Sequence, residues 1–318
     1  YEKVNIRRLQ DRDKLNDLFS KLLKIRHQMA LNAGYENYRD YMFAELGRFD
    51  YAVKDCEQFH EAIKTEVIPL VNKIYQKRKQ QLQAAQLFPY DLEVDPQNHP
   101  ALHPFKTEEE FIEKTIKCLH KVDPMFAQSI SIMNEMQHLD LNSRKGKAPG
   151  GYNMTLPETG VPFVFMNAAG TQRDLETIVH EAGHAVHSFL MRNLPYNFDM
   201  EISSEMAELA SMSMEFLSIE GWDVFYSDED KKRAVESHLV GTITMLPWIA
   251  LIDKFQHWIY TNPEHTNEAR ENKWEELHKE LSSEIIDWTP YSDFRKTMWH
   301  KQLHIFEIQF YYIEYGIA

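Results

Sequence analysis

Cysteine is nearly absent from this sequence. Its 318 residues include only Cys56 and Cys118, which lie far apart in segments with helical periodicity. A framework of disulfides is therefore not indicated, and we expect a cytoplasmic protein. Each thiol is expected to be a small buried apolar side chain rather than a nucleophile, because free cysteine is among the most buried residue types.

Positive charge and long apolar runs are also scarce. The 35 Lys and Arg residues are outnumbered by 49 Asp and Glu residues, which gives a formal net charge of −14. Nucleic acids and anionic membranes bind clustered basic side chains, so neither is expected as a partner. No stretch of about 18 consecutive apolar residues occurs, so a membrane-spanning segment is not expected either.

Helical periodicity, in contrast, is abundant. Apolar residues recur three and four positions apart along most of the chain, which predicts a mostly α fold. The residue pattern changes in "GKAPGGYNMTLPETGVPFVFMN", where Gly, Pro and two short extended runs predict a β-hairpin that turns at 158–160. Helices are expected at 12–34, 36–46, 51–83, 107–121, 124–138, 171–193, 203–218, 227–261, 266–284 and 291–318.

A pair of histidines lies in "ETIVHEAGHAVHSFL", residues 176–190. His180 and His184 are four residues apart, so on a helix both imidazoles leave the same face and can bind one zinc ion. Glu181 is offset by about 100° and can reach a water on that ion without binding the ion, as a general base does. Gly183 indicates that another element packs closely there. The alternative is a pair of histidines that pack in a core, but the helical, apolar context favours a metal.

A catalytic zinc site needs a third protein ligand, and the next predicted helix offers acidic candidates. Glu201, Glu205, Glu208 and Glu215 recur along "EISSEMAELASMSMEFL" at spacings that place them on one helical face. A solvated acidic stripe is the alternative. The helix is rich in Met, Leu and Ala, however, which predicts burial, and buried carboxylates need partners. Glu208 is the preferred ligand because it is central, and Glu215 is expected to accept a hydrogen bond from a ligand histidine.

His187 is not expected to bind the metal. Metalloproteases with three histidine ligands need the third one six residues after the second, and that position is Leu190. We therefore interpret His187 as a packing residue or as a hydrogen-bond partner of the site.

These segments together resemble a known family. "HEAGHAVH" followed by "EMAELASMSMEFL", the hairpin before them and "HIFEIQFYYIEYGIA" after them are similar to the thimet-oligopeptidase and oligoendopeptidase F family of zinc metallopeptidases. The resemblance implies Zn²⁺ held by His180, His184 and Glu208, with Glu181 as the base. It also implies a mostly α, zincin-like fold with a small sheet beside the HExxH helix.

The resemblance further implies how the chain is organised. Residues 1–143 are expected to form a helical region in the wall of a deep channel that admits short unstructured peptides. Residues 144–318 are expected to form the zinc-binding catalytic core. Family members carry further helical regions, and this chain begins with Tyr1 and stops in an apolar stretch, so we expect a fragment of a longer protein.

The C-terminal segment offers groups that can stabilise a transition state. A phenol hydroxyl is a good donor to the oxyanion that develops during peptide hydrolysis. On a helix, Tyr311 and Tyr312 can each share a face with Tyr315, which follows four and three residues later. The family resemblance prefers Tyr312 with Tyr315 and adds His304. The alternative is an aromatic stripe in the core.

The predicted function is a cytoplasmic zinc metalloendopeptidase that hydrolyses internal bonds of short peptides with a zinc-bound water activated by Glu181. The strand at 162–167 is expected to pair with the backbone of the substrate as an added strand. Two alternatives stay open. One is an exopeptidase of the dipeptidyl-carboxypeptidase type, and the other is a helical peptide-binding module without catalysis, against which the intact Glu181 argues.

Overall fold

The computed structural model describes residues 1–148 and 150–318 and divides them into two compact units. The first unit combines residues 1–99 with residues 241–317, and the second contains residues 100–240 together with Ala318. Helix α10 (Asp228–Thr261) contributes residues to both. The division expected between residues 143 and 144 concerned where the catalytic core lies. The compact units have other bounds and do not test that division, so it stays a prediction.

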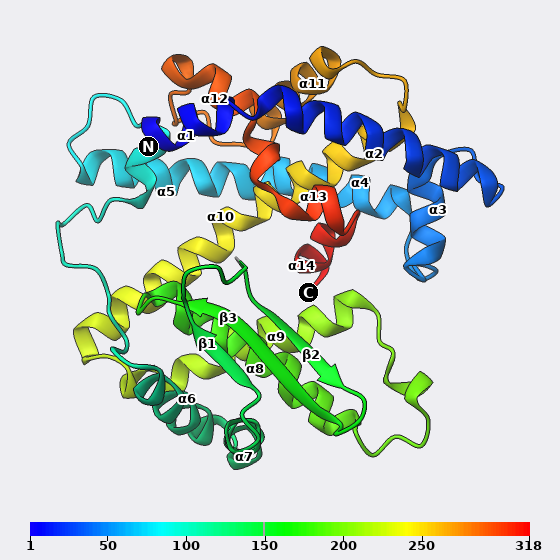
Figure 1. The fold of residues 1–318 in the computed structure, drawn as a ribbon. Helices are drawn as coiled ribbons and strands as arrows, with labels where there is room; N and C mark the ends of the chain where they lie inside the picture. Colours follow the sequence, from blue (N-terminus) through cyan, green and yellow to red (C-terminus); the bar gives the residue numbers. More distant parts are fainter. Residues whose placement is uncertain (149) are drawn as a thin grey trace. The chain divides into compact units, whose positions relative to one another are not determined.

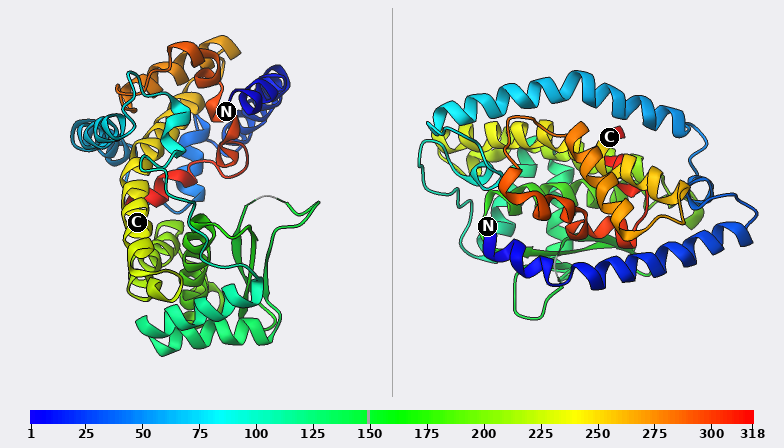
Figure 2. Two further views of the ribbon diagram at one scale, coloured as in Figure 1. Left: turned by 90° about the vertical axis from the view of Figure 1, so that its left-hand side faces the viewer. Right: turned by 90° about the horizontal axis from the view of Figure 1, so that it is seen from above.

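The first unit consists of helices, as the periodicity predicted. The second half of α10 and helix α11 lie between α2 on one side and α5 on the other (Figure 2, right). Apolar side chains from these helices form one hydrophobic core, which includes Phe19, Phe255 and Trp274. Besides α10, the helices of this unit are α1 (Glu2–Leu9), α2 (Arg12–Asn32), α3 (Tyr38–Glu45), α4 (Val53–Ala62), α5 (Ile68–Gln81), α11 (Asn267–Glu280), α12 (Ser292–Lys296), α13 (Leu303–Glu307) and α14 (Glu314–Ile317).

The predicted long helix at 51–83 is interrupted at one place. A π-helical turn, Ile63–Val67, lies between α4 and α5, and Pro69 occupies the first turn of α5. Proline has no backbone N–H and its ring collides with the carbonyl of the preceding turn. The wider π turn accommodates both effects, so the chain continues as a helix beyond the proline.

The C-terminal segment is not the continuous helix that was predicted at 291–318. It consists of short helical turns, and Phe310 between them has a left-handed backbone with φ of 63°. Tertiary hydrogen bonds hold this break. Phe310 donates its N–H to Gln256 Oε1 at 3.0 Å, and its carbonyl accepts from Arg48 Nη2 at 2.5 Å. Arg48 also forms a buried ion pair with Glu314, so the turn is fixed on both sides.

The second unit contains the only sheet among the described residues. The hairpin prediction is confirmed: β2 (Tyr152–Leu156) pairs antiparallel with β3 (Val161–Ala168), with Leu156 opposite Val161. A strand that was not predicted, β1 (Leu139–Asn142), pairs parallel with β3 on its other side. The order is therefore β1-β3-β2 (Figure 1). The helices of this unit are α6 (Glu108–Val122), α7 (Pro124–Glu135), α8 (Gln172–Met191), α9 (Ser204–Leu217) and the first part of α10.

This order corrects one prediction. Strand β3 contains residues 162–167, and both of its edges are already paired with β1 and β2. Its backbone groups are used within the sheet, so a substrate strand cannot be added to it. The prediction of substrate pairing at 162–167 is therefore wrong.

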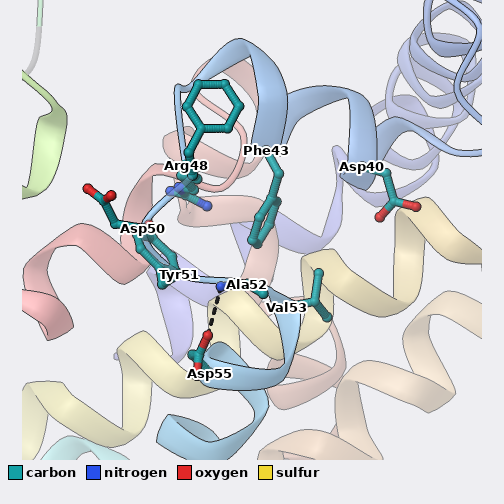
Figure 3. A pocket seen from close by; sticks show the side chains of 9 residues that line it. Asp40, Phe43, Arg48, Asp50, Tyr51, Ala52, Val53 and Asp55 are labelled. Atoms are coloured by element: carbon teal, nitrogen blue, oxygen red, sulfur yellow. Dashed lines mark hydrogen bonds between the residues drawn. The ribbon is translucent and has the colours of Figure 1, made fainter.

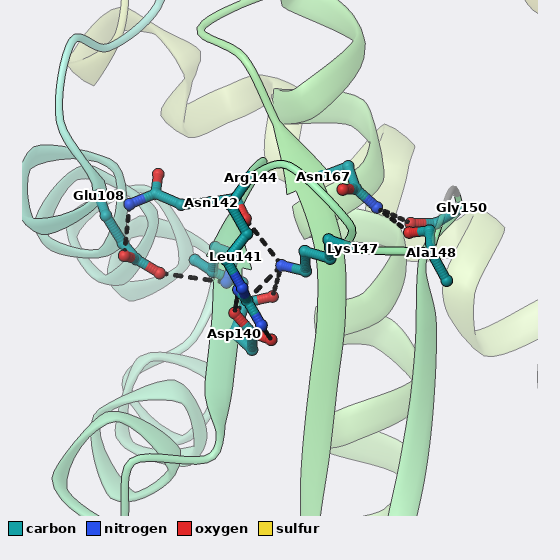
Figure 4. Close-up of polar contacts among 9 residues, drawn as sticks. All are labelled: Glu108, Asp140, Leu141, Asn142, Arg144, Lys147, Ala148, Gly150 and Asn167. Carbon is teal, nitrogen blue, oxygen red and sulfur yellow. Dashed lines mark hydrogen bonds and ion pairs between the residues drawn. The ribbon is translucent and has the colours of Figure 1, made fainter.

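A polar cluster holds the segment between β1 and β2 (Figure 4). Lys147 Nζ donates to the backbone carbonyl of Asp140 at 2.9 Å and to its carboxylate at 3.1 Å, and Arg144 pairs with the same carboxylate at 2.5 Å. Hydrogen bonds from Arg144 and Lys147 outweigh partial burial and lower the pKa of Asp140 to about 2. Asn167, near the end of β3, donates to the carbonyls of Ala148 at 2.6 Å and Gly150 at 3.1 Å. The loop is thus tied to the ends of both parallel strands.

Helix α8 lies against the sheet. It contacts β2 and β3 and also packs along α9, and the left view of Figure 2 shows the strands beside these helices. The apolar side chains of α8 that face this core include Ile178, Val179 and Val186. The sheet and helices α6 to α9 share one hydrophobic core, which fixes the orientation of α8.

Helix α10 meets the length and composition expected of a membrane-spanning helix, with a mean hydropathy of 1.4 over its most apolar window, of which 33% is buried. Its apolar residues have a structural explanation within the first unit. Ile249, Leu251, Ile252 and Phe255 are all buried in that hydrophobic core.

Candidate metal centre

The start of α8 sets the position of the histidines along the chain. Thr171 is the N-cap, and the Asp174 carboxylate accepts a hydrogen bond from the Thr171 N–H at 2.7 Å and from the Thr171 hydroxyl at 2.9 Å. A carboxylate in the first turn also interacts favourably with the helix dipole. His180 and His184 then leave the same face of α8, with ring centroids 5.0 Å apart.

Gly183 brings α9 close to that face. A Cβ atom at this position would lie 2.5 Å from the carbonyl oxygen of Ala210 and 2.6 Å from the Cα of Ser211. Only glycine allows two helix backbones to approach so closely. The expectation that another element packs against Gly183 is confirmed, and that element carries Glu208.

The side chains of His180, His184 and Glu208 converge. One potential ligand atom from each lies within 4.8 Å of the other two. Glu208 Oε2 lies 3.3 Å from His180 Nε2 and 3.8 Å from His184 Nε2. Two ligands of one tetrahedral zinc ion, each about 2.0–2.1 Å from it, lie roughly 3.3 Å apart. The three residues therefore fit a zinc ion in both spacing and chemistry.

Burial favours a charged or hydrogen-bonded partner for the Glu208 carboxylate. Only 2% of this residue is exposed, and its Oε2 atom also accepts a hydrogen bond from Ser211 Oγ at 2.7 Å. A buried carboxylate is unfavourable unless it is paired with positive charge or hydrogen-bonded. Ser211 lies one helical turn after Glu208, so it orients the carboxylate toward the two histidines.

The pKa values of the two histidines shift in opposite directions. Burial lowers the pKa of His180, but hydrogen bonds with Glu208 and Glu215 outweigh burial and raise this pKa to about 10. The pKa of His184 is lowered to about 4, chiefly by burial and then by the charge of His180.

Glu181 is buried beside the cluster without being part of it. Glu181 is 5% exposed, and its Oε2 atom has no hydrogen-bond partner among the described residues. Burial raises the pKa of Glu181 to about 7, although the charge of His180 lowers it. Its backbone carbonyl accepts a hydrogen bond from Asn153 Nδ2 of β2 at 3.1 Å, which links α8 to the sheet. A buried carboxyl with a free oxygen is suited to accept a proton.

The other acidic candidates and His187 lie outside the three-residue group. Glu201 precedes α9 and is exposed, so the four glutamates do not share one helical face as predicted. Glu205 lies in the first turn of α9, one turn before Glu208. His187 has a buried Nδ1 atom without a partner among the described residues, and burial lowers its pKa.

Comparison with known proteins identifies the family. The model of peptidase family M3 matches residues 1–318, the full length of the chain. The chain belongs to peptidase family M3.

Several family M3 relatives resemble the chain in sequence and in structure. Oligopeptidase PepF of Bacillus subtilis (strain 168) is 27% identical over 244 residues, covering 73% of this chain and 35% of that protein. Chromosomal oligoendopeptidase F of Lactococcus lactis subsp. cremoris is 25% identical over 255 residues, covering 78% and 41%. The solved structure of Pz peptidase A with an inhibitor has a TM-score of 0.91 at 28% identity, covering 97% of this chain and 54% of that one.

These comparisons confirm two predictions and show how much of each relative the chain covers. The family resemblance and the mostly α fold with one small sheet are both confirmed. The chain spans 35% and 41% of the two curated relatives and 54% of the solved structure.

Two residues near the candidate metal centre of this family M3 chain, Glu176 and His238, were not singled out from the sequence. Glu215, which was predicted to accept a hydrogen bond from a ligand histidine, has its Oε1 atom 2.7 Å from His180 Nδ1. His238 Nε2 lies 3.7 Å from the other oxygen of Glu215, and His238 Nδ1 lies 3.5 Å from Glu176 Oε1. The spacing of four between Glu176 and His180 was an available signal, whereas nothing local marks His238.

The aromatic candidates gather in the first unit of the family M3 chain. The ring of His304 has its centroid 5.1 Å from that of Tyr312 and 6.2 Å from that of Tyr315. Tyr311 and Tyr312 each lie within 5.6 Å of Tyr315 by centroid distance. Tyr312 is buried, and Tyr315 and Tyr311 are half-buried. The structure thus brings all four side chains together, although not on one helical face.

The first unit also contains a second group of potential metal ligands, Cys56, Asp253 and His257. The Asp253 carboxylate already lies 2.8 Å from His60 Nε2 and 3.1 Å from His257 Nε2. Burial, together with the charge of Asp253, raises the pKa of Cys56 to about 12, so its thiol stays protonated at neutral pH. We interpret this group as a buried polar network rather than a metal centre.

A cavity of about 480 Å³ opens in the first unit beside the loop between α3 and α4 (Figure 3). Phe43, Arg48 and Tyr51 line it together with several acidic residues. None of its lining residues is among the predicted site residues. The cavity is therefore not assigned to the peptidase chemistry.

Proposed function

We propose that this chain is part of a zinc-dependent metalloendopeptidase that hydrolyses internal bonds of short peptides. The observation that carries the proposal is the convergence of His180 Nε2, His184 Nε2 and Glu208 Oε2 beside Glu181, whose Oε2 atom is buried without a partner among the described residues. Membership of peptidase family M3 supports the same reaction.

His180, His184 and Glu208 hold the metal in this proposal. A zinc ion bound there acts as a Lewis acid and makes water a stronger nucleophile at neutral pH. Glu181 accepts the proton of the attacking water at its free oxygen and later donates it to the leaving amine. Its buried position keeps the carboxyl group within the pH range in which it can both accept and donate a proton.

Tyr315, Tyr312 and His304 are proposed to assist this reaction. A phenol hydroxyl of Tyr315 donates a hydrogen bond to the oxyanion of the tetrahedral intermediate, and Tyr312 and His304 lie against Tyr315 and contribute to the same environment. The roles of these three residues rest on the family resemblance and on the contacts among their rings.

Substrate pairing is proposed at β2. An extended peptide adds to an outer strand of a sheet, and β2 is an outer strand whose residues include exposed Tyr152 and Met154. Main-chain hydrogen bonds carry no side-chain preference, which suits an enzyme that accepts many sequences.

The remaining features of the proposal concern the whole protein. Short peptides are the proposed substrates, and residues 1–143 form part of the wall of the channel that admits them, with the catalytic core in residues 144–318. The chain is proposed to be a fragment of a longer, cytoplasmic protein. Its two cysteines are free and buried, which is consistent with a reducing compartment.

Metal analysis of purified protein tests the proposal. We expect one zinc per chain in the unaltered protein, and loss of tight binding in His180→Ala, His184→Ala and Glu208→Ala, because three ligands are the minimum for a stable site. Glu205→Ala is the matched control on α9 and is expected to keep zinc. Full zinc in Glu208→Ala, or none in the unaltered protein, contradicts the proposal.

Product analysis separates the endopeptidase from the exopeptidase alternative. Peptides blocked at both ends and incubated with the full-length enzyme are expected to be cut at internal bonds. Release of C-terminal dipeptides from unblocked peptides alone would instead favour a dipeptidyl carboxypeptidase.

A further inference from the structure

We propose that His238 and Glu176 are positioning residues that act on the metal ligand His180 through Glu215. This inference rests on the proposed zinc site and extends it outward by two side chains. It concerns how firmly the ligand is held and oriented, and it assigns neither residue a contact with substrate or metal.

The first step is the contact between Glu215 and His180. Glu215 Oε1 lies 2.7 Å from His180 Nδ1, while Nε2 of the same ring faces Glu208. A carboxylate that accepts the Nδ1–H fixes the tautomer with a free Nε2 and sets the rotation of the ring. The usefulness of His180 as a ligand therefore depends on where the Glu215 carboxylate is held.

The second step is the contact between Glu215 and His238. His238 comes from α10, and its Nε2 atom lies 3.7 Å from Glu215 Oε2, the oxygen that does not face His180. Its Nδ1 atom lies 3.5 Å from Glu176 Oε1. The imidazole of His238 thus stands between two carboxylates and limits the movement of Glu215.

The third step anchors this arrangement to α8. Glu176 lies one turn before His180 on α8, and Gln172 lies one turn earlier still and donates its Nε2–H to Glu176 Oε1 at 3.0 Å. The side-chain Oε1 atom of Gln172 in turn accepts a hydrogen bond from the Tyr226 hydroxyl. A polar ladder therefore runs from Gln172 to Glu176 along one turn of α8 and reaches His180 through His238 of α10 and Glu215 of α9.

Packing around His238 restricts the movement of this group of polar side chains. His238 is 5% exposed, and its ring contacts those of Phe216 and Trp222, with centroids 5.1 and 5.6 Å away. Trp222 and Tyr226 are themselves buried in the hydrophobic core of the second unit. Such walls restrict the rotamers of His238, and a buried polar network with few rotamers holds its members more precisely than a solvated one.

A zinc affinity measurement tests the inference. His238→Phe keeps the ring against Phe216 and Trp222 but removes both nitrogens, and Glu215→Gln keeps an acceptor without the charge. We expect Glu215→Gln to weaken zinc binding by about 10–100-fold and His238→Phe by about tenfold, measured by competition with a chromogenic chelator. Because His238 acts through Glu215, the double variant is expected to bind zinc no more weakly than Glu215→Gln alone.

Controls separate positioning from general destabilisation. Leu119→Val changes a fully buried side chain of α6 in the same core and is expected to lower the melting temperature without changing zinc affinity. The spectrum of cobalt-substituted protein reports the geometry of the ligands, and it is expected to change in His238→Phe but not in Leu119→Val. Glu176→Gln, which retains side-chain length, is a second variant and is expected to shift the affinity in the same direction as His238→Phe.

The outcomes distinguish the inference from the proposed function. Tight zinc binding by the unaltered protein with unchanged affinity in His238→Phe and Glu176→Gln overturns the inference and leaves the zinc site intact. Additive losses in the double variant overturn the route through Glu215. Absence of zinc from the unaltered protein, with no change in His180→Ala, overturns the proposed function and the inference together.

Discussion

At the scale of single residues, Glu181 and the histidines beside it share a helix but are expected to do different work. The histidines and Glu208 present converging ligand atoms, whereas Glu181 keeps a buried oxygen without a partner among the described residues. Binding and proton transfer are therefore separable by mutation.

We predict that Glu181→Gln keeps zinc and loses activity. The amide cannot accept a proton at neutral pH, so kcat of the full-length enzyme is expected to fall by about 10²–10⁴-fold, with zinc content unchanged by metal analysis. Glu205→Gln serves as a control on α9 and is expected to retain turnover. Near-normal kcat in a zinc-loaded Glu181→Gln enzyme removes this residue from the base role.

Tyr315 allows a second test at the same scale. Tyr315→Phe deletes one hydroxyl, so the aromatic contacts with His304 and Tyr312 stay available. We expect kcat of the full-length enzyme to fall by about 10²-fold with little change in unfolding free energy.

Tyr35→Phe, a half-buried tyrosine of the same unit, is the control for loss of a hydroxyl. A packing role alone for Tyr315 predicts equal kcat in the two variants. A larger effect of Tyr312→Phe or Tyr311→Phe than of Tyr315→Phe moves the donor role to that residue.

At the scale of secondary-structure elements, the approach of α8 to α9 decides whether the candidate metal ligands converge. The two histidines are on α8 and Glu208 is on α9, so the ligand set depends on the separation of the two helices. Gly183 permits that separation because a Cβ atom would collide with the backbone at Ala210 and Ser211.

We predict that Gly183→Ala weakens both the fold and the metal site. The atoms in the way belong to backbone, so the helices must move apart, which is expected to cost about 1–3 kcal/mol in unfolding free energy and to weaken zinc binding. The control is Gly241→Ala in helix α10, where nothing lies within 4 Å of the added atom. That change is expected to stabilise the protein by about 0.5–1 kcal/mol.

Urea unfolding and zinc competition measure the two effects. Unchanged zinc affinity in a Gly183→Ala protein would show that the helices tolerate the extra methyl group and that their approach does not set the site.

At the scale of the whole molecule, buried histidines make stability depend on pH. Burial, with smaller effects of Arg295 and Lys301, lowers the pKa of His278 to about 3. Burial likewise lowers the pKa of His300 and of His265 to about 4. In the unfolded chain these groups take up protons near pH 6.5, so the unfolded state binds more protons than the folded state at mildly acidic pH.

We therefore predict that stability is full above about pH 6.5 and falls as the pH drops toward 4. A single such histidine contributes up to about 1.4 kcal/mol per pH unit within that window. His278→Gln is expected to flatten this dependence when urea unfolding is repeated between pH 7 and 5. Leu277→Val, a buried neighbour, is expected to lower stability equally at every pH.

Identical slopes in His278→Gln and the unaltered protein would mean that His278 does not carry this dependence.

Much of the fold follows from patterns that span only a few residues. The four-residue spacing of His180 and His184, the cap formed by Thr171 and Asp174, and the alternation around the β2–β3 turn are each encoded locally. Helix geometry or strand pairing acts on them over one or two turns of chain. The sequence therefore determined the helices that carry the candidate ligands, the hairpin before them and the family.

Other features depend on residues that lie far apart in the chain. The break at Phe310 forms because Arg48 and Gln256 bond its carbonyl and N–H, which replaces local helix hydrogen bonds. The central place of β3 follows from its parallel pairing with β1, which no local pattern marks.

The same holds for the candidate metal centre. All four glutamates fitted the sequence pattern, and only the packing of α9 at Gly183 brought Glu208, rather than Glu201 or Glu205, to the histidines. His238 reached Glu215 from α10 through tertiary packing alone. Local patterns fix which groups leave one face of an element, but only the packed chain decides which faces meet, because that depends on contacts between residues distant in sequence.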